Sequence, residues 1–258
     1  MADYKSIEWL EDEKALRLLN QLMLPGKLEY CLYTTVEGIA SAIKDMTVRG
    51  APAIGVAAAY GLVAAANETG GNDLDQLKAK LANAAALLRN ARPTAVNLFW
   101  ALDEMEHRAN IQGATSADDL MSALLHSAHD IAQEDITINT NIGKSAMALM
   151  PEGKVTFIHH CNTGSLATVK YGTALGIIRM AHESGLTVNV FVDETRPRLQ
   201  GARLTSWELK ELGIAHRLIV DGASSLVMQK FDVDMCVVGC DRVAANGDFA
   251  NKVGTCNL

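Results

Sequence analysis

The pattern of apolar and polar positions changes near the middle of this 258-residue chain. Over residues 6–33, short apolar stretches alternate with polar ones, which predicts a small antiparallel meander. From Thr35 onward, apolar residues recur three to four positions apart, as on an amphipathic helix that Thr34 or Thr35 caps. The same periodicity predicts further helices at about 52–67, 73–90, 94–110, 115–133 and 136–149.

Strands and helices alternate after Pro151-Glu152-Gly153. We predict strands at 154–159, 187–192, 215–220 and 234–239, with helices between them at 168–184, 202–212 and 222–230. This alternation is typical of βαβ units, which build a parallel sheet with right-handed crossovers. The chain is therefore predicted to be an α/β protein, with a meander and helical domain at 1–150 and a parallel-sheet domain at 151–258.

The amino-acid composition disfavours several kinds of binding partner and cellular location. The net charge of −7 argues against a nucleic-acid or membrane-surface binder, because such proteins use basic patches. Five cysteines form no Cys-x-x-Cys pair, which is weak as a disulfide framework or a metal site and fits the reducing cytoplasm. The chain shows no signal-peptide pattern and no apolar run of membrane-spanning length. We expect a cytoplasmic protein whose ligand is a small molecule.

Polar residues directly follow the predicted strands, among them Cys161, Asp193, Asp221 and Asp241. Ligands of parallel sheets bind outside the carboxyl ends of the strands, so these residues mark a candidate active site. Cys161 stands in a polar turn at a predicted helix start, which favours a reactive thiol; the alternative is a small buried hydrophobe. Asp241 follows an apolar strand, where partial shielding would suit a general acid or base, and the alternative is a simple turn.

Two neighbouring histidines, His159 and His160, precede Cys161. They have no partner at metal-ligand spacing, so we assign them to packing and hydrogen bonding, although one of them could line the site. We predict no metal site.

Two segments combine an arginine with a proline that suits a helix start. In Arg49-Gly50-Ala51-Pro52 a glycine permits close approach of a ligand, and Arg92-Pro93 repeats the arrangement. A cation ahead of the positive end of a helix suits a phosphate. The alternatives are a tightly packed helix start and, for Arg92, an ordinary surface arginine.

The loop at 193–203 and the segment after Asp241 offer further polar groups. The loop is either a salt-bridged connector or a lid in which Gln200 reaches a sugar hydroxyl. Lys252 could add a cation near a phosphate.

Taken together, five segments in order resemble the family of methylthioribose-1-phosphate isomerase, which also contains ribose-1,5-bisphosphate isomerase and the alpha, beta and delta subunits of initiation factor 2B. The segments are Arg49-Gly50-Ala51-Pro52-Ala53-Ile54-Gly55, Arg92-Pro93-Thr94-Ala95-Val96-Asn97, His160-Cys161-Asn162-Thr163-Gly164, Asp193-Glu194-Thr195-Arg196-Pro197 and Asp241-Arg242-Val243-Ala244-Ala245-Asn246-Gly247-Asp248.

The resemblance implies a homodimer with a Rossmann-like C-terminal domain. It implies a cofactor-free aldose–ketose isomerase of methionine salvage, which converts 5-methylthioribose 1-phosphate into 5-methylthioribulose 1-phosphate. Residue by residue, it assigns Cys161 and Asp241 to catalysis. The substrate contacts that it implies are Arg49, Gly50, Ala51, Arg92, Gln200, Asn251 and Lys252.

Two departures from the family pattern stand out: Cys240 replaces a small residue ahead of Asp241, and the chain ends at Leu258, where family members continue. From the second we expect a sheet domain truncated at its C-terminus, with exposed apolar surface. Two alternatives remain open: a related substrate, 5-deoxyribose 1-phosphate or ribose 1,5-bisphosphate, and a non-catalytic regulatory subunit. A nucleotide-binding domain is disfavoured because no Gly-x-Gly-x-x-Gly follows the strand at 154–159.

Overall fold

The chain forms two compact units in the computed structural model, which describes residues 4–68, 73–111 and 113–258. Residues 5–23 and 28–136 make up the first, which we call the helical unit. Residues 4, 24–27 and 137–258 belong to the second, the sheet unit. The predicted α/β class is confirmed, with an antiparallel sheet in one unit and a parallel sheet in the other. The domain boundary at residue 150 stays a prediction, since the units divide inside helix α5 (Ala117–Ala146).

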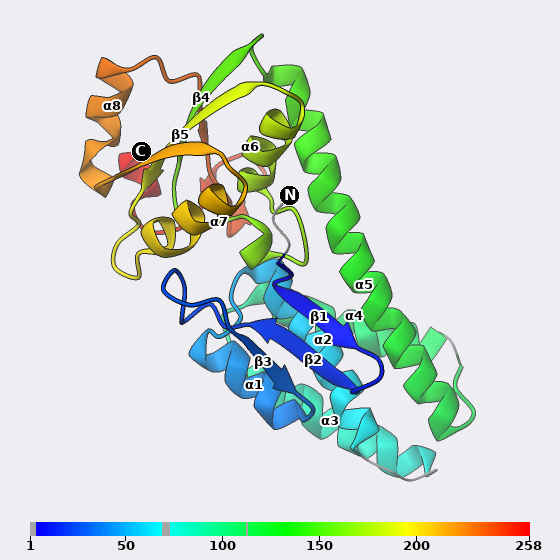
Figure 1. Cartoon of the computed structure of the whole chain (residues 1–258). Helices are drawn as coiled ribbons and strands as arrows, with labels where there is room; N and C mark the ends of the chain where they lie inside the picture. The colour runs from blue at the N-terminus through cyan, green and yellow to red at the C-terminus, as the bar shows by residue number, and fades with distance from the viewer. Residues whose placement is uncertain (1–3, 69–72, 112) are drawn as a thin grey trace. The chain divides into compact units, whose positions relative to one another are not determined.

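The predicted meander opens the helical unit (Figure 1). Strands β1 (Ile7–Leu10), β2 (Ala15–Leu19) and β3 (Tyr30–Tyr33) pair antiparallel in the order β1-β2-β3. The central strand β2 carries Leu16 and Leu18, which are fully buried. This sheet therefore contributes one side of the unit's core.

Four helices follow the meander: α1 (Val36–Asp45), α2 (Ala51–Asn67), α3 (Leu74–Ala91) and α4 (Val96–Ile111). The Thr35 side chain accepts a hydrogen bond from the Gly38 amide at the start of α1, which confirms the predicted cap. Helix α2 is buried on every side over 53–66, because its alanines and glycines let neighbouring helices approach closely. At Gly55, an added Cβ would lie only 3.0 Å from the Asn97 carbonyl oxygen of α4.

The prediction of separate helices at 115–133 and 136–149 is wrong. Helix α5 runs without a break for 30 residues and ends in a 3₁₀ turn, Met147–Leu149. The segment Gln133-Glu134-Asp135-Ile136 contains neither glycine nor proline, so its run of polar residues continues the helix instead of ending it. Among the helices that the structure describes, α5 included, none is long and apolar enough to cross a membrane.

The sheet unit is built on four parallel strands, β4 (Lys154–His159), β5 (Thr187–Asp193), β6 (Ala215–Ile219) and β7 (Met235–Val237). Their order is β6-β5-β4-β7. Helices α6 (Ala174–Glu183) and α7 (Ser206–Glu211) contribute Ile178 and Leu209 to the core on one face. On the other face, Val227 of α8 (Ser224–Lys230) packs against Ile158 and Phe191 (Figure 1).

Three connections differ from prediction. Helix α6 begins at Ala174 instead of 168, because a 3₁₀ turn at Ser165–Ala167 and a bridge between Gly164 and Gly172 come first. A π-helical turn, Gly201–Thr205, precedes α7. Beyond Asp241, a short antiparallel hairpin forms from β8 (Arg242–Val243) and β9 (Phe249–Ala250) where a loop was expected. Strands β4, β5 and β6 end within one residue of the predicted positions, and β7 ends two residues earlier, at Val237.

Candidate functional site

Cys161 occupies a strained turn two residues beyond β4. Its φ of 71° is in the left-handed region, and only 7% of the residue is exposed. Its amide donates to Thr195 Oγ1 (2.8 Å), and its carbonyl accepts from Thr205 Oγ1 (2.6 Å). No α-helix begins directly after it, so the expected helix start beside the thiol is absent from this part of the structure.

A second strained residue, Thr195, lies two residues beyond β5. Its φ is 63°, unusual for a β-branched side chain. The carboxylate of Asp221 compensates, because it accepts the amide hydrogens of both Thr195 and Arg196 at 2.7 Å. Such strain costs about 1–3 kcal/mol per residue and clusters at functional sites. The linked strained turns at Cys161 and Thr195 therefore mark this edge of the sheet as a candidate active site.

A buried carboxylate, that of Glu208, lies under the turn that carries Cys161. It accepts hydrogen bonds from Asn162 Nδ2 (2.7 Å), Ser165 Oγ (2.7 Å) and Tyr4 OH (2.8 Å). Burial and the Glu208 charge raise the pKa of Tyr4, so the phenol stays a donor. Gly164 has no room for a side chain, since a Cβ would lie 2.4 Å from both Glu208 oxygens. The hydrogen bonds to Glu208 thereby fix the position of the turn that carries Cys161.

His159 is a neutral connector between strands. Its Nδ1 donates to the Val237 carbonyl of β7 (2.6 Å), and the Thr163 hydroxyl donates to its Nε2 (3.3 Å). Complete burial lowers the pKa of His159 to about 4. This environment matches the packing role expected from the sequence.

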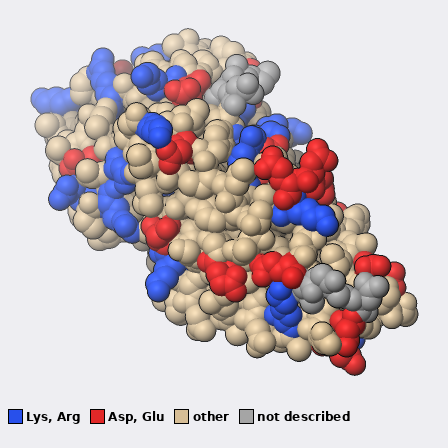
Figure 2. Space-filling model, turned by 60° about the horizontal axis from the view of Figure 1, so that its bottom comes forward, with Lys and Arg blue, Asp and Glu red and all other residues tan. Residues whose placement is uncertain are grey.

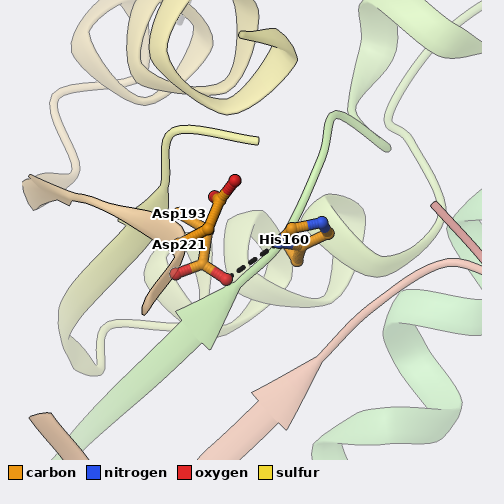
Figure 3. A group of neighbouring side chains, drawn as sticks. All are labelled: His160, Asp193 and Asp221. Carbon is orange, nitrogen blue, oxygen red and sulfur yellow. Dashed lines mark hydrogen bonds and ion pairs between the residues drawn. The ribbon is translucent and has the colours of Figure 1, made fainter. Parts of the chain in front are cut away.

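His160 points toward the carboxylates of Asp193 and Asp221 (Figure 3). One ligand-type atom of each lies within 4.8 Å of the others, which is compatible in size with a metal site. Those atoms already have partners, however: His160 Nδ1 pairs with Asp193 Oδ2 at 2.8 Å, and Asp221 accepts two backbone amides. The donor set fits a hydrogen-bonded ion pair better than a metal centre.

Asn251 lies near the same turn, and Val253 and Gly254, which follow Lys252, contact His160 just ahead of Cys161. A Cβ on Gly239 would lie 2.9 Å from the Thr163 methyl carbon and 3.6 Å from Asn251 Oδ1, so these groups pack around Gly239. Both Asn251 and Lys252 are half-buried. The structure thus brings one predicted substrate contact, Asn251, and the backbone that follows Lys252 close to the Cys161 turn.

Asp241 is more exposed to solvent than the sequence led us to expect. It follows β7, the strand that pairs with β4, and its amide donates to the Ala250 carbonyl (2.7 Å). Its side chain is exposed instead of partly shielded. Every residue of the segment 240–250, which includes the β8–β9 hairpin, is likewise exposed.

Gln200 has a buried acceptor without a partner. Only 6% of the residue is exposed, and among the described residues nothing hydrogen-bonds to its Oε1. The next residue, Gly201, packs on the end of β5, where an added Cβ would lie 1.7 Å from the Asp193 carbonyl oxygen. A buried acceptor left unpaired costs about 1–3 kcal/mol, so this amide is suited to a ligand's hydroxyl group.

The remaining predicted contacts belong to the helical unit. Gly50, with a φ of 98°, caps the amino end of α2, and Ala51 is exposed beside it. Arg49 precedes this cap and is half-buried. Arg92 is the C-cap of α3, and a turn over 92–95 separates it from α4. Pro93 is therefore not the first residue of a helix, contrary to prediction.

Both arginines still precede helices that pack together, because Gly55 of α2 touches Asn97 at the start of α4. Two neighbouring helix N-termini with arginines suit an anion. On the face that Figure 2 draws, lysine and arginine side chains stand in separate groups with acidic and uncharged residues between them. That distribution suits a small anion better than a polyanion.

Sequence reasoning missed the residues that support the site. Glu208, Thr205, Ser224 and Tyr4 carry no local motif, and Glu208 looks like a surface charge on a short helix. Asp193 and Asp221 stand out in the sequence for their place at strand ends, and Asp193 also begins a segment that resembles the family. Their partners are not predictable from local sequence, because they come from distant parts of the chain.

Comparison with known proteins places the chain among related sequences and folds. The Initiation factor 2 subunit family matches residues 47–258. A protein of Pseudothermotoga lettingae named methylthioribose-1-phosphate isomerase 2 is 58% identical over 100% of this chain and 73% of its own length.

Two solved structures are also similar. The 5-methylthioribose 1-phosphate isomerase of Pyrococcus horikoshii has a TM-score of 0.91 and 41% identity, covering 97% of this chain and 69% of its own. A structure titled translation initiation factor eIF-2B, subunit delta, from A. fulgidus, has a TM-score of 0.88 and 42% identity, covering 98% and 72%.

Proposed function

Because the chain belongs to the Initiation factor 2 subunit family, we propose that it is the family's aldose–ketose isomerase, which converts 5-methylthioribose 1-phosphate into 5-methylthioribulose 1-phosphate in methionine salvage. The observation that carries the proposal is 58% identity, over the whole chain, with a protein of that name. The buried, strained turn at Cys161 supports it, since a binding module needs no such thiol.

The chemistry explains the residues required. A phosphate on the anomeric oxygen prevents the sugar ring from opening through a free hydroxyl. An acid must therefore protonate the ring oxygen, after which a hydrogen moves from C2 to C1 and the C2 hydroxyl becomes the carbonyl. We assign the proton transfers to Asp241 and the partner role to Cys161, which follow neighbouring parallel strands, β7 and β4.

Substrate binding is assigned to two groups of residues. In the helical unit, Arg49, Gly50, Ala51 and Arg92 would bind the phosphate through guanidinium groups and a helix N-terminus. In the sheet unit, Lys252 would add a cation, while Asn251 and Gln200 would bind sugar hydroxyls. The unpaired Gln200 Oε1 supports this assignment. No cofactor enters the proposed reaction.

Two substitutions test the catalytic pair. Cys161→Ser and Asp241→Asn each preserve size, so we expect kcat to fall about 100-fold or more in each while the fold persists. Cys31→Ser, which changes a thiol on β3 of the helical unit, is the matched control and should keep wild-type turnover. Normal kcat in Asp241→Asn would refute its assignment to proton transfer.

The group at C5 of the substrate is tested with three compounds. We expect kcat/KM to be highest for 5-methylthioribose 1-phosphate, compared with 5-deoxyribose 1-phosphate and ribose 1,5-bisphosphate. A preference for the bisphosphate would replace the proposed substrate without changing the reaction class.

A second candidate function is a non-catalytic regulatory subunit. The observation that favours it is 42% identity with a structure titled translation initiation factor eIF-2B, subunit delta. This reading predicts binding of a sugar phosphate without turnover, so the same kinetic measurement separates the two.

We also propose that the chain works as a homodimer in the cytoplasm. Its five cysteines are free thiols, which suits a reducing compartment. Light scattering after gel filtration should give twice the monomer mass, and a monomer would contradict the dimer.

A further inference from the structure

We propose that His160 is a positioning residue that, as an imidazolium ion paired with Asp193, holds the backbone of segment 251–254 against the turn carrying Cys161. The inference rests on the proposed function, because it assigns a purpose to the placement of Asn251 and Lys252, the two proposed substrate contacts in that segment.

The partners of the His160 ring require two ring protons. Its Nδ1 lies 2.8 Å from Asp193 Oδ2, and its Nε2 lies 2.9 Å from the Val253 carbonyl oxygen. A carbonyl accepts only, and an ionised carboxylate accepts only. With Asp193 ionised, both ring nitrogens donate, which a neutral imidazole cannot do.

The surroundings of His160 favour that charge. Asp193 faces it from β5 and Asp221 from the turn ahead of α8, while the preceding His159 is neutral. Burial opposes the positive charge, but the hydrogen bonds to Asp193 and Val253 and the two acidic charges outweigh it and raise the pKa of His160. A Ser224 hydroxyl donates to the other Asp193 oxygen at 2.7 Å, which keeps that carboxylate in place.

Contacts of the His160 ring and backbone connect the His160–Asp193 pair to the turn that carries Cys161. Gly254 packs directly on the ring, where an added Cβ would lie 2.7 Å from Cε1. The residue after His160 is Cys161, whose amide donates to Thr195 Oγ1, and that hydroxyl donates to the Asp193 carbonyl (3.1 Å). One ion pair thus joins the ends of β4 and β5 to the segment that carries Lys252.

Two substitutions separate the roles of the ring nitrogens. In His160→Gln the amide can stand where Nε2 stands and keep the bond to Val253, whereas in His160→Asn it can replace only Nδ1. For the substrate 5-methylthioribose 1-phosphate, we expect His160→Asn to raise KM about 10-fold with kcat changed much less, and His160→Gln to raise KM about threefold or less. The exposed His126, changed to Gln, is the matched control and should behave as wild type.

The ring protons are measured directly on the unaltered full chain by ¹⁵N NMR of the histidine side chains. We expect both His160 nitrogens to be protonated at neutral pH, with the Nε2 proton protected from exchange. A singly protonated ring, or a His160→Asn enzyme with wild-type KM, would overturn the inference. If the wild type does not turn over the sugar phosphate, the proposed function fails, while the ring measurement still decides whether His160 is the doubly protonated partner of Asp193 and Val253.

Discussion

The buried side chain of His159 makes the stability of the sheet unit depend on pH. Because burial lowers its pKa from 6.5 to about 4, the unfolded chain takes up a proton before the folded chain does. Its contribution to stability is complete above the unfolded pKa and is lost as the pH falls toward the folded one.

We therefore expect the free energy of unfolding to fall, between pH 7 and about pH 4.5, by about 2 kcal/mol more in the wild type than in His159→Asn. In the variant, the amide can keep the bond to the Val237 carbonyl, so the comparison isolates the titration. Urea unfolding at both pH values makes the measurement. Equal pH dependence in both proteins would show that His159 does not titrate in this way.

The hydrogen bonds of Glu208 predict that this buried carboxylate stabilises the sheet unit. In Glu208→Gln an amide NH₂ would face donors from Asn162, Ser165 or Tyr4, leaving at least one buried donor unpaired. We expect a loss of about 2 kcal/mol in the free energy of unfolding, measured with urea. Glu211→Gln, an exposed position on the same helix, should change it by less than about 0.5 kcal/mol. Similar values for both variants would contradict the role given to Glu208.

At the scale of elements, the π-helical turn at Gly201–Thr205 depends on a residue without a side chain. The added methyl group of Gly201→Ala would meet the Asp193 carbonyl oxygen at 1.7 Å, so the turn must move away from β5. We expect a loss of about 3 kcal/mol, read from urea unfolding, together with lower turnover. Gly222→Ala meets nothing within 4 Å and should be close to neutral. A Gly201→Ala protein as stable as Gly222→Ala would refute the close packing.

The local sequence pattern predicted the positions of helices and strands better than it predicted the geometry of the site. Strand β4 matches its predicted bounds. Its run of β-branched and apolar residues lies between a glycine and a polar turn, and such a run favours a strand. The start of α6 was misplaced by six residues, because the bridge between Gly164 and Gly172 is a tertiary pairing. The break expected in α5 is absent because the polar segment at 133–136 contains neither glycine nor proline.

In the site, polar residues at strand ends were predictable, because parallel strands present their carboxyl ends at one edge. The contacts that these residues make were not predictable from the sequence. The bonds from Thr205 and Glu208 to the Cys161 turn span more than 40 residues of sequence, and no local period encodes them. The exposure of Asp241 likewise depends on a hairpin whose two-residue strands carry no clear signal.

At the scale of the whole molecule, the chain is a member of the Initiation factor 2 subunit family and resembles a sugar-phosphate isomerase over its whole length. Apolar side chains of the sheet unit remain exposed in this structure, among them Val220, Leu226, Val243, Phe249 and Val253.

The most direct test of the central claim is phosphorus NMR of the purified full chain incubated with 5-methylthioribose 1-phosphate and no added cofactor. In the aldose, C1 carries one hydrogen beside the phosphate, so the phosphorus signal is a doublet. In the ketose, C1 is a CH₂ group, so the signal becomes a triplet. We predict that the doublet is replaced by the triplet with the wild type and persists with Cys161→Ser. A doublet that remains unchanged with the folded wild-type chain would contradict the account.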